Sequence, residues 1–212
     1  MKEMKVRLTF TDTILGTKPA DPEIHSRFVA SKAPDAKTIA QELAAHEASV
    51  EDVEERTKTI FHKMEDGTPY IEHYQVKGFF KSTCKALQQV PGTESGKKNT
   101  KGTFYKFASY KSKIDQLIFV SPDIIPLWMP INLDLTATDC QRPLRASTPQ
   151  GERIALAHSE EAPAGTTVEF TVTCLVDDHM KLVREWLDYG KFSGLCQWRN
   201  AGHGRFEWEE IG

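Results

Sequence analysis

A glycine-rich run near the C-terminus, Gly190–Phe206, constrains the fold more than any other segment. It reads G-K-F-S-G-L-C-Q-W-R-N-A-G-H-G-R-F and precedes a short apolar and acidic stretch, Arg205–Ile211, that we predict to be the last strand. Glycine is used where φ must be positive or where the backbone must approach another group closely. The run therefore predicts a tight turn on a packed base. It is either a helix C-cap followed by a hairpin-like turn or a loop that faces an anion.

Strands are predicted where apolar and polar residues alternate. Met4–Phe10 and Thr166–Val176 both show this period of two, which is typical of a half-buried strand. Asp66-Gly67 lies between two short apolar stretches and predicts a hairpin turn. Further strands are expected at Gln116–Val120, Ile131–Ala137 and Arg153–Ala157. The second of these is expected to end in Thr138–Arg145 and to be followed by a loop through Gly151.

Two core helices follow from apolar residues at three- and four-residue spacing. The first is predicted at Phe79–Val90, where Phe80, Cys84 and Leu87 share one face. The second precedes the glycine-rich run and begins at Asp177 or Asp178 as N-cap. Its buried stripe is Leu182, Val183, Trp186 and Leu187.

Residues 17–65 are predicted to be a helical, acidic insertion after the first strand. Its helices are expected at Asp21–Val29, Asp35–His46 and Val50–Phe61. The simpler interpretation is that this insertion is a solvent-exposed surface, and the alternative is that it binds a basic partner protein.

Residues 91–113 are predicted to be a basic loop. No acidic residue occurs from Ser95 to Ile114, and aromatic residues alternate with lysines there. Lysines that neutralise phosphates and aromatic rings that stack on bases make a single-strand binding surface. The alternative is a basic surface loop whose aromatic rings anchor it to the core.

A second short motif lies at Tyr74–Leu87, Y-Q-V-K-G-F-F-K-S-T-C-K-A-L. Lys77, Lys81 and Lys85 recur every four residues, so they lie along one side of a helix and its entry. Beside a helix that begins after Gly78, such lysines could bind a phosphate together with exposed backbone N–H groups.

Together, Gly190–Phe206 and Tyr74–Leu87 resemble two motifs of the repeat-associated mysterious protein (RAMP) superfamily, whose members form CRISPR effector backbones or process guide RNA. The first is similar to the glycine-rich loop between a helix and the last strand. The second is similar to the strand-to-helix segment that carries a Lys-Gly pair. The resemblance implies an α+β fold with a ferredoxin-like β-α-β-β-α-β core, an antiparallel sheet with two helices on one face, in a single domain over residues 1–212.

The function implied by this resemblance is non-catalytic binding of single-stranded RNA or DNA, with head-to-tail assembly along the strand. A stand-alone phage or mobile-element relative would also fit. The nucleic-acid-binding residues expected on this basis and from the basic segments are Lys77, Lys81, Lys97, Lys98, Lys101, Phe104, Tyr105, Lys106, Tyr110, Lys111, Lys113, Arg142, Arg145, Arg199, Gly202, Gly204 and Arg205.

Two other functions remain open at this stage. One is a metal-independent RNA-processing enzyme with a histidine general base, for which His25, His73 and His203 are candidates. Asp139 beside Arg142 is a further candidate acid, although metal-assisted cleavage usually needs two or three carboxylates. The other is a protein-interaction module that interferes with a CRISPR complex and has no role in binding nucleic acid.

Charge and cysteine content set limits on these functions. The formal net charge is −3, so nucleic acid would have to bind at a local basic patch. The four cysteines are far apart and form no C-x-x-C pair, which predicts free thiols in a cytoplasmic protein. No apolar run approaches the roughly 18 residues that span a bilayer. We expect neither a metal nor another cofactor.

Overall fold

The computed structural model describes residues 1–20, 58–97, 109–131, 133–148 and 151–212, and its contacts divide the chain into two compact units. Unit 1 comprises Met1–Ile14, Lys63–Leu133 and Pro163–Gly212, and unit 2 comprises Leu15–His62 and Asp134–Ala162. The chain is a mixed α+β protein, as predicted. Most of the acidic insertion lies outside the described residues, and its boundaries and those of the basic loop remain predictions.

Unit 1 is built on a four-stranded sheet in the order β13-β1-β12-β7. The strands are β1 (Lys2–Phe10), β7 (Ile118–Ser121), β12 (Thr167–Cys174) and β13 (Phe206–Glu210). Each neighbouring pair is antiparallel; Val6, for example, pairs with Phe170 on one side and Glu210 on the other. The strands predicted from alternation at Met4–Phe10 and Thr166–Val176 are confirmed as β1 and β12.

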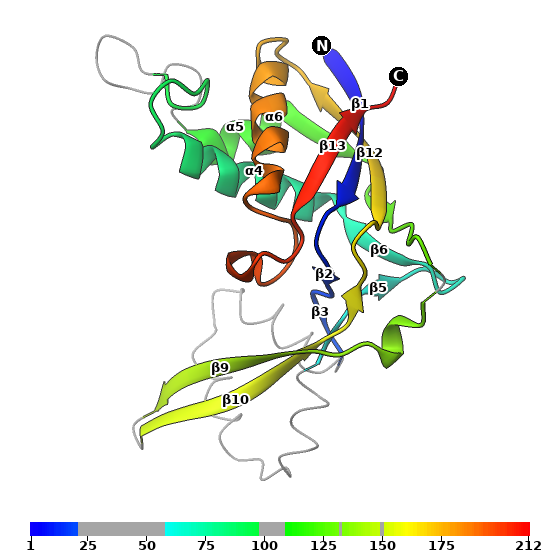
Figure 1. The fold of residues 1–212 in the computed structure, drawn as a ribbon. Helices are drawn as coiled ribbons and strands as arrows, with labels where there is room; N and C mark the ends of the chain where they lie inside the picture. Colours follow the sequence, from blue (N-terminus) through cyan, green and yellow to red (C-terminus); the bar gives the residue numbers. More distant parts are fainter. Residues whose placement is uncertain (21–57, 98–108, 132, 149–150) are drawn as a thin grey trace, which may run out of the picture. The chain divides into compact units, whose positions relative to one another are not determined.

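Three helices belong to unit 1: α4 (His73–Leu87), α5 (Tyr110–Leu117) and α6 (His179–Asp188). Figure 1 shows them on one side of the four-stranded sheet. The predicted stripe of α6 is buried, and Trp186 packs on Phe80 of α4 with ring centroids 5.5 Å apart. The rings of Phe79 and Phe206 of β13 have centroids 5.2 Å apart, so α4 packs against the end of the sheet.

Helix α4 begins six residues before its predicted start at Phe79. Glu72 and Gln75 form a reciprocal capping box, so the first turn starts at His73. Lys77 and Gly78 therefore lie inside the helix, and the predicted strand-to-helix segment at Tyr74–Leu87 is entirely helical. The backbone N–H groups expected to bind a phosphate beside Gly78 belong to the helix interior, and that part of the prediction is wrong.

The predicted Asp66-Gly67 hairpin is confirmed between β5 (His62–Lys63) and β6 (Pro69–Glu72). Gly67 has a φ of 84°, and the Met64 N–H donates to the Thr68 carbonyl at 2.9 Å. A third strand, β8 (Ile124–Pro126), pairs antiparallel with β6.

Unit 2 contains a second four-stranded sheet, in the order β3-β4-β10-β9. Its strands are β3 (Lys18–Pro19), β4 (Thr59–Ile60), β9 (Cys140–Thr148) and β10 (Gly151–Ser159). The short strands β2 (Ile14–Leu15) and β11 (Glu161–Ala162) form a separate two-stranded sheet.

Three predictions for unit 2 are wrong. The end of the helix expected at Val50–Phe61 contains strand β4. The strand expected at Ile131–Ala137 contains a 3-10 turn, η2 (Leu135–Ala137), because the Asp134 side chain accepts the Thr136 N–H. The loop expected between Arg145 and Gly151 contains the end of β9, which continues to Thr148. Pro143 is tolerated in β9 because this strand is the edge of its sheet.

In the part of the chain that the structure describes, no helix combines the length and apolar character needed to cross a membrane.

Candidate nucleic-acid interface

The C-terminal glycine loop, residues 192–205, connects the short turn η3 (Tyr189–Lys191) to β13 and folds back on itself. The Leu195 N–H donates to the Gly204 carbonyl at 2.9 Å, and the Gly204 N–H donates to the Thr13 carbonyl at 2.8 Å. Between these closing bonds lies η4 (Arg199–Ala201). The loop is thus a closed turn held against the end of β1, which agrees with the predicted tight turn.

Two glycines allow this closure. A Cβ atom at Gly194 would lie 2.1 Å from the Gly204 carbonyl carbon, so only glycine leaves room for the two segments. Gly204 has a φ of 72°, and a Cβ there would lie 2.1 Å from the Leu195 carbonyl oxygen. Gly202, also a predicted site residue, has a φ of 101°.

Two larger residues of the glycine loop also have positive φ. The values are 64° for Cys196 and 50° for Trp198. A left-handed conformation at a residue with a large side chain costs free energy and persists only when surrounding contacts impose it. Such strain is common at binding sites.

The side chain of Trp198 stacks on that of His203. The ring centroids are 5.0 Å apart, and the planes differ by 12°. The His203 Nδ1 lies 2.9 Å from the Thr13 hydroxyl, which fixes the orientation of the imidazole. Trp198 is 37% exposed as a residue, so the pair presents an oriented aromatic surface at the loop.

The two arginines of the glycine loop differ in their partners. Arg199 donates through Nη1 to the Ser82 hydroxyl of α4 at 3.0 Å. The Nε of Arg205 is buried and has no hydrogen-bond partner among the described residues. No acidic residue occurs from Tyr189 to Phe206. The loop therefore combines an oriented aromatic pair with guanidinium groups and no carboxylate of its own.

The predicted lysines of α4 have acceptors on α5. Lys81 forms an ion pair with Asp115 at 2.6 Å, and Lys77 donates to the Asp115 carbonyl at 3.2 Å. Lys77 also lies 5.3 Å from the centroid of the Phe119 ring. Burial is the main cause that lowers the pKa of Lys77 below its usual value.

The basic segment is described only at its ends. Lys97 forms an ion pair with Glu94. Tyr110, Lys111 and Lys113 lie in helix α5 and not in a loop, which corrects their predicted structure. Lys98, Lys101, Phe104, Tyr105 and Lys106 lie outside the described residues.

Arg142 and Arg145 lie on β9 in unit 2, so they belong to a different compact unit from Arg199 and Arg205. Near them, Asp139 accepts a hydrogen bond from His158 Nδ1 at 2.8 Å and one from the Gln141 amide at 3.0 Å. Burial acts to raise the pKa of Asp139, but the two hydrogen bonds together with the nearby charges of His158 and Lys58 hold the pKa below its usual value.

The remaining catalytic candidates are dispersed. His73 Nδ1 lies 3.4 Å from Asp123, and His25 lies outside the described residues. Among the described residues, no three His, Cys, Asp or Glu side chains form a group that could hold a metal ion.

On the sheet face opposite the helices of unit 1, Arg7 and Lys5 are paired with acidic side chains. Arg7 donates to Glu169 at 2.7 Å and to Glu209 at 2.9 Å, and Lys5 lies 3.5 Å from Glu169. Lys77 and Lys81, two of the predicted nucleic-acid-binding residues, lie on helix α4, on the other side of the sheet.

Among the described residues, the glycine loop brings together four predicted site residues: Arg199, Gly202, Gly204 and Arg205. Sequence reasoning missed Trp198 as part of this site, and it missed Thr13 and Ser82 as the residues that hold His203 and Arg199. The presence of a tryptophan inside an acid-free, glycine-rich run was the one signal that could have identified Trp198.

Similar solved structures include the following two. No family model matches the chain, and no curated protein matches it. A chain of the cryo-EM structure of the Type III-B Cmr-beta complex bound to cognate target RNA is 12% identical, with a TM-score of 0.49. The match covers 100% of this chain and 60% of that chain, so this chain spans about 60% of that protein's length. A chain of a Type IV-B CRISPR complex is also 12% identical, with a TM-score of 0.46, and the match covers 100% of this chain and 91% of that chain.

Proposed function

We propose that this protein binds single-stranded nucleic acid through the C-terminal glycine loop. The observation that carries the proposal is the combination, in one closed loop, of the Trp198–His203 stack with the guanidinium groups of Arg199 and Arg205. A guanidinium group donates charge-assisted hydrogen bonds to phosphate oxygens.

The chemistry of the loop fits a polyanion. Arg199 and Arg205 can neutralise phosphates, and the loop adds no carboxylate that would repel them. The glycines permit the closed turn that positions these groups, because Gly194 and Gly204 approach the facing backbone too closely for a Cβ atom. Because the whole chain has a net charge of −3, such a local site is what binding to a polyanion requires.

The aromatic pair favours a single strand over a duplex. The face of a base is accessible for stacking on a side chain only when the base is unstacked from its neighbours. The exposed part of Trp198 is suited to such a base. The proposed ligand is therefore single-stranded RNA or DNA, bound through phosphates and one or more stacked bases.

We further infer that unit 1 is a ferredoxin-like domain. Its elements occur in the order β1, α4, β7, β12, α6, β13, with α5 as an addition after α4. In the sheet, the fourth of these strands lies beside the first and the third beside the second, all antiparallel. This arrangement supports a β-α-β-β-α-β core with insertions.

Head-to-tail assembly along the strand, as in the backbone subunits that the sequence resembles, is the finer form of the proposal. It predicts that the mass of the complex increases in steps of one protein chain as the oligonucleotide is lengthened. Mass photometry with oligonucleotides of graded length measures this, and a constant one-to-one complex would exclude assembly.

The experiment that tests the proposed function is fluorescence anisotropy with labelled single-stranded RNA, single-stranded DNA and duplex over a range of salt concentrations. We expect Arg199→Ala and Arg205→Ala to weaken binding uniformly across sequences. Each should also flatten the plot of log affinity against log salt by about 0.7 for each phosphate that the variant no longer neutralises. Lys181→Ala, an exposed lysine on α6 that is 69% accessible, is the matched control.

The results divide clearly. Tight, salt-dependent binding to a single strand that both arginine variants weaken and the lysine variant leaves unchanged would support the glycine loop. An unchanged salt slope in both arginine variants, or the same change in all three, would exclude the loop as the binding site.

A further inference from the structure

Strand β13 forms one edge of the sheet of unit 1, and its outer backbone groups have no strand partner in the described part of the chain. The Thr11 N–H donates to the Arg205 carbonyl, and the Ile211 N–H donates to the Lys5 carbonyl. Because this pairing alternates, residues 205, 207, 209 and 211 direct their backbone groups toward β1. Phe206, Trp208 and Glu210 therefore direct theirs outward.

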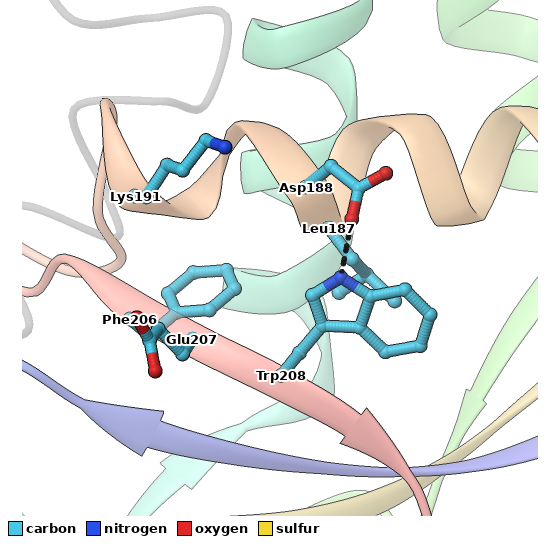
Figure 2. A pocket seen from close by; sticks show the side chains of 6 residues that line it. All are labelled: Leu187, Asp188, Lys191, Phe206, Glu207 and Trp208. Carbon is cyan, nitrogen blue, oxygen red and sulfur yellow. Dashed lines mark hydrogen bonds between the residues drawn. The ribbon is translucent and has the colours of Figure 1, made fainter.

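A pocket of about 260 Å³ lies beside this edge, between β13 and the end of α6 with η3. Figure 2 shows Asp188 and Lys191 on the helical side and Phe206, Glu207 and Trp208 on the strand side. The walls include Leu187 and the rings of Phe206 and Trp208. The Trp208 Nε1–H donates to Asp188 at 2.8 Å, which holds the indole as one wall.

The opposite side of the edge is acidic. Glu207 and Glu209 are exposed and alternate along the strand with Phe206 and Trp208, so their side chains share the sheet face of Arg7, although Glu207 also borders the pocket. Glu209 is paired with Arg7, whereas Glu207 has no ion pair with any residue that the structure describes. Glu210, on the helix side, is paired with Arg184 of α6 at 2.6 Å.

We propose that β13 is the docking edge for an extended basic segment of a partner protein, which adds to the sheet as a further strand. The segment would alternate basic and apolar residues. Its backbone would bond to the outward N–H and C=O groups of Phe206, Trp208 and Glu210. Main-chain hydrogen bonds supply affinity in this mode, and pockets for alternate side chains supply specificity.

The alternation of the partner follows from the geometry of the edge. A residue opposite Glu207 lies on the same sheet face as this carboxylate, so a basic side chain is favoured there, whereas Glu209 is already paired with Arg7. Residues opposite Phe206 and Trp208 point toward α6, where one apolar side chain enters the pocket. The charge of the edge thus selects the class of partner, and the pocket sets the register. The proposal does not depend on the glycine loop or on nucleic-acid binding.

The first test compares two charge reversals of equal size. Glu207→Lys places a cation on the proposed edge, and Glu65→Lys places one in the turn between β5 and β6, where Glu65 is exposed. The probe is a short fluorescent peptide of alternating lysine and valine. We expect Glu207→Lys to weaken its binding by about ten-fold or more and Glu65→Lys to change it by less than about two-fold. Equal losses would mean that only net charge matters and would overturn the proposal.

The second test addresses the backbone. Glu210→Pro removes the outward N–H of residue 210 without removing a bond to β1, and proline is tolerated at a sheet edge. Glu210→Ala is its control, because both variants lose the pair with Arg184. We expect binding of the alternating peptide to fall in Glu210→Pro relative to Glu210→Ala. Equal affinities would exclude strand addition.

Two control peptides complete the experiment. A peptide with the same residues in separate lysine and valine blocks, and one that alternates glutamate and valine, should both bind more weakly than the alternating basic peptide. Bound peptide should also slow hydrogen exchange at the Phe206 and Trp208 amides. Failure of the alternating basic peptide to bind, or binding without this protection, would overturn the proposal.

Discussion

The indole of Trp198 lies nearly parallel to the imidazole of His203, with 12° between the planes and 5.0 Å between the centroids. The two residues are close because η4 turns the chain between them and because the Gly204 N–H bonds to the Thr13 carbonyl. Thr13 also holds His203 through its hydroxyl. The aromatic pair is therefore positioned by the end of β1 and not by the loop alone.

Replacing Trp198 with alanine should weaken the binding of single-stranded nucleic acid. Loss of one stacked base costs about 1–3 kcal/mol, which corresponds to about a five- to 150-fold increase in Kd. Trp198→Phe keeps a flat ring and should retain most of the affinity. The measurement is anisotropy with the oligonucleotides used for the arginine variants. A Kd for Trp198→Ala equal to that of the parent protein would show that the indole does not contact the strand.

Gly194→Ala and Gly78→Ala should change stability in opposite directions. The Cβ at residue 194 would overlap the Gly204 carbonyl carbon at 2.1 Å, so the loop must open or shift. Residue 78 lies within α4, and a Cβ there would meet no atom within 4 Å. Alanine is a better helix former than glycine by about 1 kcal/mol. We expect a lower free energy of unfolding for Gly194→Ala and a higher one for Gly78→Ala.

Urea unfolding followed by far-ultraviolet circular dichroism measures both free energies. Nucleic-acid binding supplies a second comparison, since Gly194→Ala should also weaken it and Gly78→Ala should not. If Gly194→Ala proves as stable as the parent protein, residues 194 and 204 do not approach each other as closely as the loop geometry requires.

The parts of the fold that could be predicted are those in which local pattern and tertiary packing agree. Val6, Leu8 and Phe10 alternate in sequence and are all buried in β1, and the stripe of α6 is buried as predicted. Where a local side-chain bond decides the structure, periodicity gave the wrong result. Gln75 caps a helix that apolar spacing started at Phe79, and Asp134 starts a 3-10 turn where alternation predicted a strand.

The candidate site could be located by its glycines but not assembled from sequence. Gly202, Gly204, Arg199 and Arg205 are neighbours along the chain, so their proximity could be foreseen. The partners that orient the site come from distant segments: Thr13 from the end of β1 and Ser82 from α4. Single hydrogen bonds across such separations leave no periodic signal in one sequence.

Arg7→Ala should leave nucleic-acid affinity within about two-fold of the parent value, because the guanidinium already donates to Glu169 and Glu209. A marked loss of affinity would instead place the nucleic acid on the open sheet face.

The same variant should change how stability depends on pH. The pKa of Glu169 is lowered mainly by this hydrogen bond from Arg7. A carboxyl with a lowered pKa stabilises the fold above its unfolded pKa, and this stabilisation is lost as the pH falls. The Tm of Arg7→Ala should therefore depend less on pH than the Tm of the parent protein in the acidic range.

Alkaline pH should destabilise the protein through its buried thiols. Burial raises the pKa of Cys84 to about 12 and that of Cys174 to about 11. The folded protein therefore keeps these protons at pH values where the unfolded chain, with thiol pKa values near the ordinary value of about 8.5, releases them. Stability is complete below that pH and falls as the pH rises toward the folded-state values.

The corresponding measurement is urea unfolding at pH values between about 8 and 11. For Cys84→Ala, the slope of unfolding free energy against pH should be less steep than in the parent protein. The difference should correspond to at most one proton fewer released on unfolding. Identical slopes would show that Cys84 ionises equally in the folded and unfolded chains.

Ser95→Ala should destabilise unit 1 by about 1–3 kcal/mol because it leaves a buried donor without an acceptor. The Trp186 Nε1–H donates to the Ser95 hydroxyl at 2.9 Å, and that hydroxyl donates to Glu185 at 2.6 Å. Ser95 is 2% exposed and the Trp186 side chain is fully buried, so water cannot easily replace the lost partner.

Ser112→Ala on α5 is the control, since Ser112 is exposed and alanine favours the helix. Urea unfolding monitored by tryptophan fluorescence should show a lower midpoint for Ser95→Ala and an unchanged or higher one for Ser112→Ala. Equal midpoints would mean that the Ser95 hydroxyl does not hold residues 93–97 to α6.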